Sequence, residues 1–161
     1  MYILWIDPWI RKLWYAIIDV NLNIIQAWVL IDDFFSDREK QFIRLKKISL
    51  FFDKLLDNFN ITYAWIEKLY FTKYNQKNAE FVYWVRWILI EKFIKNDIIL
   101  FEFSPKEIKK NICWIWNANK EYIKNIIYKL YWLKEIPKYH DTTDALWICY
   151  LIYKKLNLWK D

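Results

Sequence analysis

The chain has 161 residues and a formal net charge of +6, from 25 Lys and Arg against 19 Asp and Glu. This length predicts a single domain over residues 1–161, and the basic balance favours a polyanionic partner such as a nucleic acid. No basic leader precedes the first apolar run, no uncharged stretch reaches the length of a membrane span, and Cys113 and Cys149 form no metal or disulfide pattern. We therefore expect a reduced, cytoplasmic protein without a signal peptide or a membrane segment.

The first element is the apolar run 2–7, which predicts a buried strand. Its only charge, Asp7, stands at the carboxyl end, where ligands gather in open α/β sheets. An Asp before Pro also commonly just opens a turn, so this position alone favours neither interpretation. Residues 14–20 and 24–31 then predict two more strands, joined by short polar turns in an antiparallel meander.

An amphipathic helix is predicted over residues 37–58, with Ser36 or Asp37 as its cap. Phe42, Ile43, Leu45, Ile48, Phe51, Phe52, Leu55 and Leu56 have the spacing of one apolar face, and the charged residues, Arg44 among them, are most simply a solvated face. Residues 61–67 predict a second buried strand, and Glu67 ends it as Asp7 ends the first.

The segment 68–77 is basic and aromatic, and Tyr70, Phe71 and Lys73 lie in it. Aromatic side chains among lysines suit stacking on unpaired bases, although the same aromatics could fold back onto the core. The next helix is predicted at 78–95, with Phe81, Val82, Val85, Ile88, Leu89 and Phe93 on its apolar side. Arg86 lies among them, either as a core-edge residue with a solvated head or as a phosphate contact.

A fifth strand is predicted at 98–103, and Pro105 then opens a short lysine-bearing helix. Its Lys109 and Lys110, with Lys120 at the start of a later helix, suit phosphate binding, although a lysine run is often only a solvated face. The block 140–148 opens a last helix. Asp141 and Asp144 share one face of its first turn, where the helix dipole stabilises negative charge.

The composition has one anomaly: the chain has no glycine and 12 tryptophans. Proteins average about 7% glycine. Several tryptophans stand where backbone geometry favours glycine, such as Trp9 after Asp-Pro, Trp114 and Trp116 in a predicted loop, and Trp84 and Trp87 on a helix that must pack closely. We hypothesise that these positions are encoded by UGA codons that the native translation system reads as glycine. If tryptophan is real, Trp5 and Trp9 should crowd Asp7.

With glycine in place of tryptophan, residues 3–19 (ILWIDPWIRKLWYAIID) resemble the opening of the bacterial RuvC Holliday junction resolvases. The similarity continues through residues 64–71 (AWIEKLYF), 85–87 (VRW), 108–123 (IKKNICWIWNANKEYI) and 140–148 (HDTTDALWI). These blocks follow the family's order over nearly the whole chain. An Asp-Pro-Gly turn is a weak signal alone, whereas the ordered blocks are a strong one.

The resemblance implies an α/β, RNase H-like fold: a five-stranded mixed sheet, three strands antiparallel and two parallel, with helices on both faces. It also implies a homodimer acting on four-way junction DNA with a branch-migration complex of the RuvA and RuvB type. The catalytic and metal-binding carboxylates carried over are Asp7, Glu67, Asp141 and Asp144. The DNA-contacting residues carried over are Lys109, Lys120 and either Tyr70 or Phe71. His140 matches no family residue with a known role.

Clustered carboxylates repel one another unless they hold cations, and all-oxygen ligation favours Mg²⁺ or Mn²⁺ over zinc. We expect two Mg²⁺ ions per subunit, with Mn²⁺ as a substitute, supporting in-line hydrolysis that leaves 5′-phosphate and 3′-hydroxyl ends. Two alternatives stay open. One is a nuclease of the RuvX/YqgF type that processes structured RNA, and the other is a junction-binding protein without catalytic activity.

Overall fold

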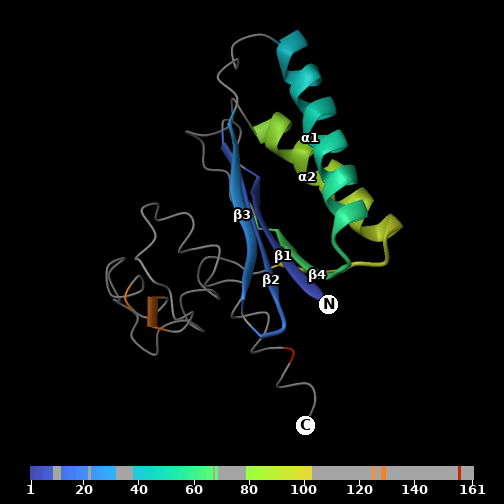
Figure 1. Ribbon diagram of the computed structural model, residues 1–161. Coiled ribbons are helices and arrows are strands. Elements are labelled where there is room, and N and C mark those ends of the chain that lie inside the picture. The colour runs from blue at the N-terminus through green and yellow to red at the C-terminus, as the bar shows by residue number, and fades with distance from the viewer. Residues whose placement is uncertain are drawn as a thin grey trace.

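The computed structural model describes residues 1–8, 12–21, 23–31, 38–66, 68 and 79–102, together with the single residues 125, 128, 129 and 156. The described elements form one sheet with two long helices against it (Figure 1). In chain order they are β1 (Tyr2–Pro8), β2 (Lys12–Asp19), β3 (Ile24–Ile31), α1 (Arg38–Asn58), β4 (Ile61–Ile66), α2 (Ala79–Lys95) and β5 (Ile99–Phe101). Each begins or ends within a few residues of its predicted position.

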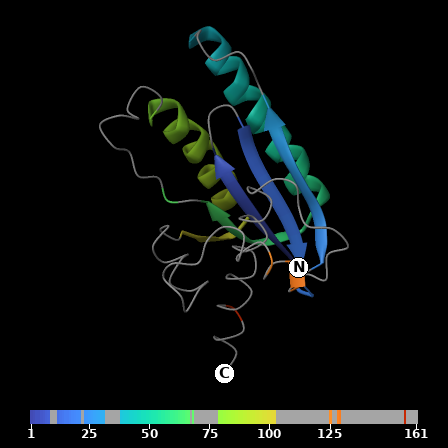
Figure 2. The same ribbon diagram turned by 90° about the vertical axis from the view of Figure 1, so that its left-hand side faces the viewer.

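The strands form a five-stranded mixed sheet in the order β3-β2-β1-β4-β5. β1, β2 and β3 make an antiparallel meander, whereas β4 pairs parallel to β1 and β5 parallel to β4. The predicted sheet of three antiparallel and two parallel strands is therefore confirmed. Because β1, β4 and β5 run in the same direction, their carboxyl ends meet at one edge of the sheet (Figure 2).

Alternate residues of each strand point to opposite faces of the sheet. On one face, Leu4, Ile6 and Ile66 pack with Phe52 of α1 and with Leu89 of α2, and all five are fully buried. Both described helices lie on this face (Figure 1). The helices predicted for the other face fall outside the described residues. The residues that carry the α2 core are those the apolar pattern predicted.

The pattern was wrong for part of α1. Arg44, assigned to the solvated face, is 4% exposed, and its Nη2 donates a hydrogen bond of 3.4 Å to the Leu30 carbonyl of β3. Phe42 and Ile43, assigned to the apolar face, are each 53% exposed. Phe42 instead stacks on Trp84 of α2, with ring centroids 5.6 Å apart. A long guanidinium side chain can bury its stem and still reach a strand carbonyl. A pattern that sorts residues only into apolar and polar cannot anticipate such a contact.

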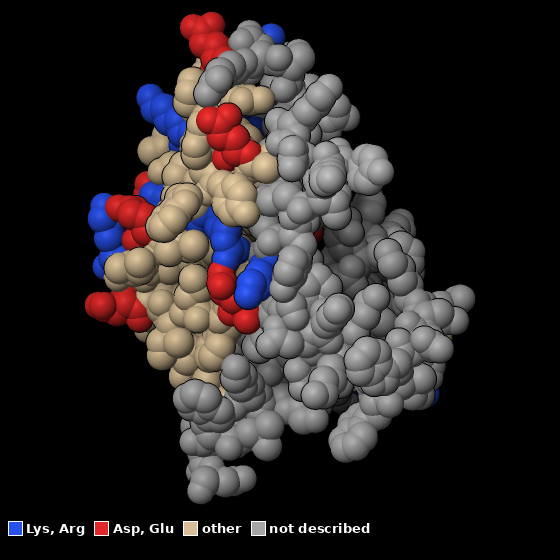
Figure 3. Space-filling view, turned by 180° about the vertical axis from the view of Figure 1, so that it is seen from behind, with Lys and Arg blue, Asp and Glu red and all other residues tan. Residues whose placement is uncertain are grey.

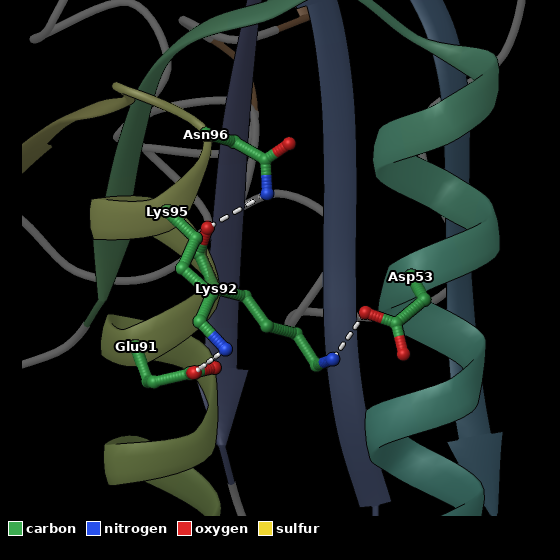
Figure 4. A network of polar contacts seen from close by, with 5 residues as sticks. All are labelled: Asp53, Glu91, Lys92, Lys95 and Asn96. Carbon is green, nitrogen blue, oxygen red and sulfur yellow. Dashed lines mark hydrogen bonds and ion pairs between the residues drawn. The ribbon is translucent and has the colours of Figure 1, made fainter.

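A polar network joins α1 to α2 (Figure 4). The Lys92 ammonium, whose side chain is 9% exposed, pairs with the Asp53 carboxylate, which is 51% exposed. The Lys92 carbonyl accepts a hydrogen bond of 2.9 Å from the Asn96 side chain. One turn away, Lys95 pairs with Glu91 on the surface of α2, and this hydrogen bond raises the pKa of Lys95. A buried lysine paired across two helices fixes their relative position.

The end of α2 shows how a chain without glycine closes a helix. Asp97 has φ 54°, the one positive value among the described residues, and the Ile98 amide donates to the Phe93 carbonyl at 2.9 Å. This is the left-handed helix ending that glycine usually occupies. No described tryptophan has a positive φ. The helix α2 packs closely against the core, with Trp84 partly buried there, whereas Trp87 is 67% exposed and lies away from that contact. The UGA hypothesis stays a prediction.

Candidate functional site at the carboxyl edge of the parallel strands

Asp7 lies near the end of β1, the central strand of the sheet. Ladders on both sides hold this strand: Asp7 pairs with Trp14 of β2, and the preceding Ile6 pairs with Ile66, the last residue of β4. The side chain is partly buried, and its Oδ1 atom is shielded from solvent. A carboxylate fixed in this way at the carboxyl edge of parallel strands has the position expected of a catalytic or metal-binding group.

Two tryptophans lie beneath this position on the same face of the sheet. Trp5 and Trp65 are register partners, 2% and 0% exposed, and their rings stack at 6.1 Å with an interplanar angle of 5°. Because Trp5 is two residues before Asp7, the two side chains share a face. The indole pair and the carboxylate therefore share one face of the sheet, and the crowding of Asp7 stays a prediction. Trp9 lies outside the described residues.

The other predicted catalytic residues, Glu67, Asp141 and Asp144, lie outside the described residues. Apart from Arg86, the predicted DNA contacts also lie outside them: Tyr70, Phe71, Lys73, Lys109, Lys110 and Lys120. The same holds for His140, to which no role is assigned. Within the described ranges, no three acidic, histidine or cysteine side chains gather into a group that could hold a metal. The structure therefore brings no two of the predicted carboxylates together within its described part.

Arg86 is the predicted DNA contact that the structure describes. Its side chain is 11% exposed, and its guanidinium forms an ion pair with Glu102, the residue that follows β5. Burial lowers the pKa of Arg86, and the nearby Tyr83 opposes this shift. Of the two interpretations left open by the sequence, this position favours the core-edge residue.

The sequence pattern does not single out Glu102, because it predicts one strand over 98–103 with the glutamate inside it. β5 ends at Phe101, so a carboxylate follows this parallel strand as well. The available signal was the repetition itself: apolar strands that finish in an acidic residue at Asp7, Glu67 and Glu102.

Charges on the described surface are mixed in sign. In Figure 3, acidic and basic side chains alternate over the coloured part of the molecule without a continuous basic patch on the face shown. None of the helices within the described ranges combines the length and the apolar character needed to cross a membrane.

Comparison with known proteins decides the family. A family model described as "Crossover junction endodeoxyribonuclease RuvC" matches residues 3–151. The chain belongs to the RuvC family. A RuvC relative from Natranaerobius thermophilus is 30% identical over 91% of this chain and 90% of its own. Another, from Pseudothermotoga lettingae, is 31% identical over 93% of this chain and 92% of its own.

Solved RuvC structures have the same fold. The Thermus thermophilus RuvC structure superposes with a TM-score of 0.80 and 19% identity, covering 98% of this chain and 97% of that one. The T. thermophilus RuvC in complex with a Holliday junction substrate gives a TM-score of 0.78 with 19% identity, covering 97% of this chain and 96% of that one. The RNase H-like fold expected for a RuvC chain is thus confirmed.

Proposed function

We propose that this protein is a metal-dependent endonuclease that resolves four-way DNA junctions by paired nicking. The observation that carries the proposal is the match of the RuvC family model to residues 3–151, nearly the whole chain. The placement of Asp7 supports it, because this carboxylate stands at the carboxyl edge of the parallel strands and is held by ladders on both sides.

The donor set suits the expected metals. The β1–β4 register ends at Ile6 and Ile66, and the residue that follows each of them in the sequence is a carboxylate, Asp7 or Glu67. Asp141 and Asp144 complete an all-oxygen set, which suits Mg²⁺ or Mn²⁺. When bound, two such ions would lower the pKa of a water molecule and stabilise the leaving 3′ oxygen. Asp7 would hold its carboxylate in place without reorganisation, because β1 cannot shift without breaking two ladders.

The other groups would bind and position DNA. Lys73, Lys109, Lys110 and Lys120 would contact phosphates, and Tyr70 or Phe71 would stack on bases at the open junction centre. The products would carry 5′-phosphate and 3′-hydroxyl ends. A homodimer would place one site on each of two strands, and a branch-migration complex of the RuvA and RuvB type would supply the junction.

The test is the variant Asp7→Asn on a labelled four-way junction in Mg²⁺. We expect the cleavage rate to fall on the order of 10²- to 10³-fold while junction binding stays within about twofold. Asp19→Asn is the matched control, because Asp19 pairs with Tyr2 at the opposite end of β1 and β2 and is only partly buried. It should cleave as the wild type does.

Cleavage by Asp7→Asn at the wild-type rate would refute the assignment of Asp7. A wild-type protein that cleaves precursor ribosomal RNA but not the junction would favour the RuvX/YqgF-type alternative. Binding of the junction without cleavage under any divalent metal would favour the non-catalytic alternative.

A further inference from the structure

The ion pair between Arg86 and Glu102 joins the middle of α2 to the end of β5. Arg86 lies one turn before the fully buried Leu89, and Glu102 is the first residue after the strand. Only 11% of the arginine side chain is exposed, compared with 39% of the glutamate side chain. The guanidinium is therefore largely withdrawn from any ligand that approaches from solvent.

The strand register places this pair on the opposite face of the sheet from Asp7. Trp5 pairs with Trp65, and Trp65 pairs with Phe101, so these three side chains share the Asp7 face. The Phe101 ring also contacts the Tyr63 ring of the same face, with centroids 6.1 Å apart. Glu102 follows Phe101 and alternates to the other face, where Leu100 packs with the core beneath α2. Glu102 thus points away from the Asp7 face, although it follows a parallel strand.

A phosphate contact by Arg86 would need this pair to open. The opening would leave the Glu102 carboxylate, 39% exposed, without its cation and next to a polyanion, and like charges repel. The chain continues from Glu102 into the sequence that carries Lys106, Lys109 and Lys110. Arg86 therefore holds the residue that directly precedes this sequence.

We propose that Arg86 is a positioning residue. Through Glu102 it ties the carboxyl end of β5 to α2, and so anchors the residue from which the chain continues to the lysines proposed to contact phosphate. This inference rests on the proposed function, because it assumes that the protein binds and cleaves a junction.

The test asks whether Glu102→Gln weakens or tightens the binding of junction DNA. If Arg86 is a positioning residue, Arg86→Met and Glu102→Gln should each weaken junction binding by about fivefold, and the double variant should be no weaker than either single one. If Arg86 instead contacts phosphate, Glu102→Gln should tighten binding, because it frees the guanidinium and removes an anion. Lys95→Met is the matched control, since Lys95 is also a paired cation on α2 but is exposed, and it should bind as the wild type does.

Binding is measured well below the melting temperature of each variant, so that all are folded, and the cleavage rate at saturating junction is measured beside it. That rate should stay within about twofold of the wild type, because the pair lies on the face opposite Asp7. Tighter or unchanged binding by Glu102→Gln, or additive losses in the double variant, would overturn the inference. A wild-type protein that does not cleave the junction would instead overturn the proposed function.

Discussion

The ion pair between Lys92 and Asp53 gives the sharpest stability prediction, because its two members differ in burial. Asp53→Asn leaves the Lys92 ammonium, 9% exposed, next to a neutral amide. Lys92→Met removes the buried charge, keeps most of the aliphatic stem, and leaves the Asp53 carboxylate, 51% exposed, to be hydrated. The two variants break the same contact and should differ in cost.

The magnitude follows from this asymmetry. Removing one partner of a fully buried pair costs about 3–5 kcal/mol, whereas an exposed pair contributes about 0–1 kcal/mol. With one partner half exposed, we expect Asp53→Asn to lower the free energy of unfolding by about 2 kcal/mol, and Lys92→Met by less than about 1 kcal/mol. At an m-value of about 2 kcal/mol per molar, Asp53→Asn should shift the urea midpoint by about 1 M.

The assay is urea unfolding at pH 7, followed by far-ultraviolet circular dichroism. Lys95→Met is the control, because it removes an exposed ion pair one turn away, and its midpoint should match that of the wild type. Equal losses for Asp53→Asn and Lys92→Met, or a larger loss for Lys92→Met, would refute the reasoning from burial.

The remaining predictions concern pH, metal and composition. Burial raises the pKa of Asp19, but hydrogen bonds from the Asn23 side chain and from the Asn23 and Asn21 amides outweigh it, so the net pKa lies below its ordinary value. This stabilisation is present above the unfolded pKa and disappears as pH falls through the folded one. Asp19→Asn should therefore have a lower melting temperature than the wild type at pH 7, and the two should converge in acid; a constant difference would contradict this. Chelation of divalent metal should abolish junction cleavage and Mn²⁺ should restore it, whereas cleavage that persists in excess chelator would exclude the metal-dependent assignment. Mass spectrometry of the native protein tests the UGA hypothesis: we expect an intact mass below 20.3 kDa, and a mass at that value ends the hypothesis.

The fold could be predicted largely from the sequence because its signals are local and repeated. Continuous apolar runs mark β1 and β4, and the apolar side of α2 was identified residue by residue. The order of the strands was not in those runs. The resemblance to the RuvC family predicted how many strands run parallel and antiparallel, and the order itself came from the structure, since nothing in a strand's own sequence says which neighbour it pairs with.

The interior polar contacts could not be predicted. A pattern that sorts residues only into apolar and polar predicts that Arg44 and Lys92 are exposed. Both are buried, because Arg44 binds the Leu30 carbonyl of β3 and Lys92 pairs with the Asp53 carboxylate of α1. These partners are 14 and 39 residues away in the sequence, and periodicity carries no information about them. For the site, the sequence predicted Asp7 at the end of a buried strand, but it did not predict the ion pair between Arg86 and Glu102.

The placement of Asp7 on β1 has a consequence for how the protein loses activity. β1 is the one described strand that is flanked by a full antiparallel ladder on one side and a long parallel ladder on the other. Partial unfolding of a domain usually begins at sheet edges and helix ends. The backbone amides of β1 should therefore be among the last to exchange with deuterated water. Heating should then leave this carboxylate in place until the whole domain melts, without a folded but misaligned intermediate.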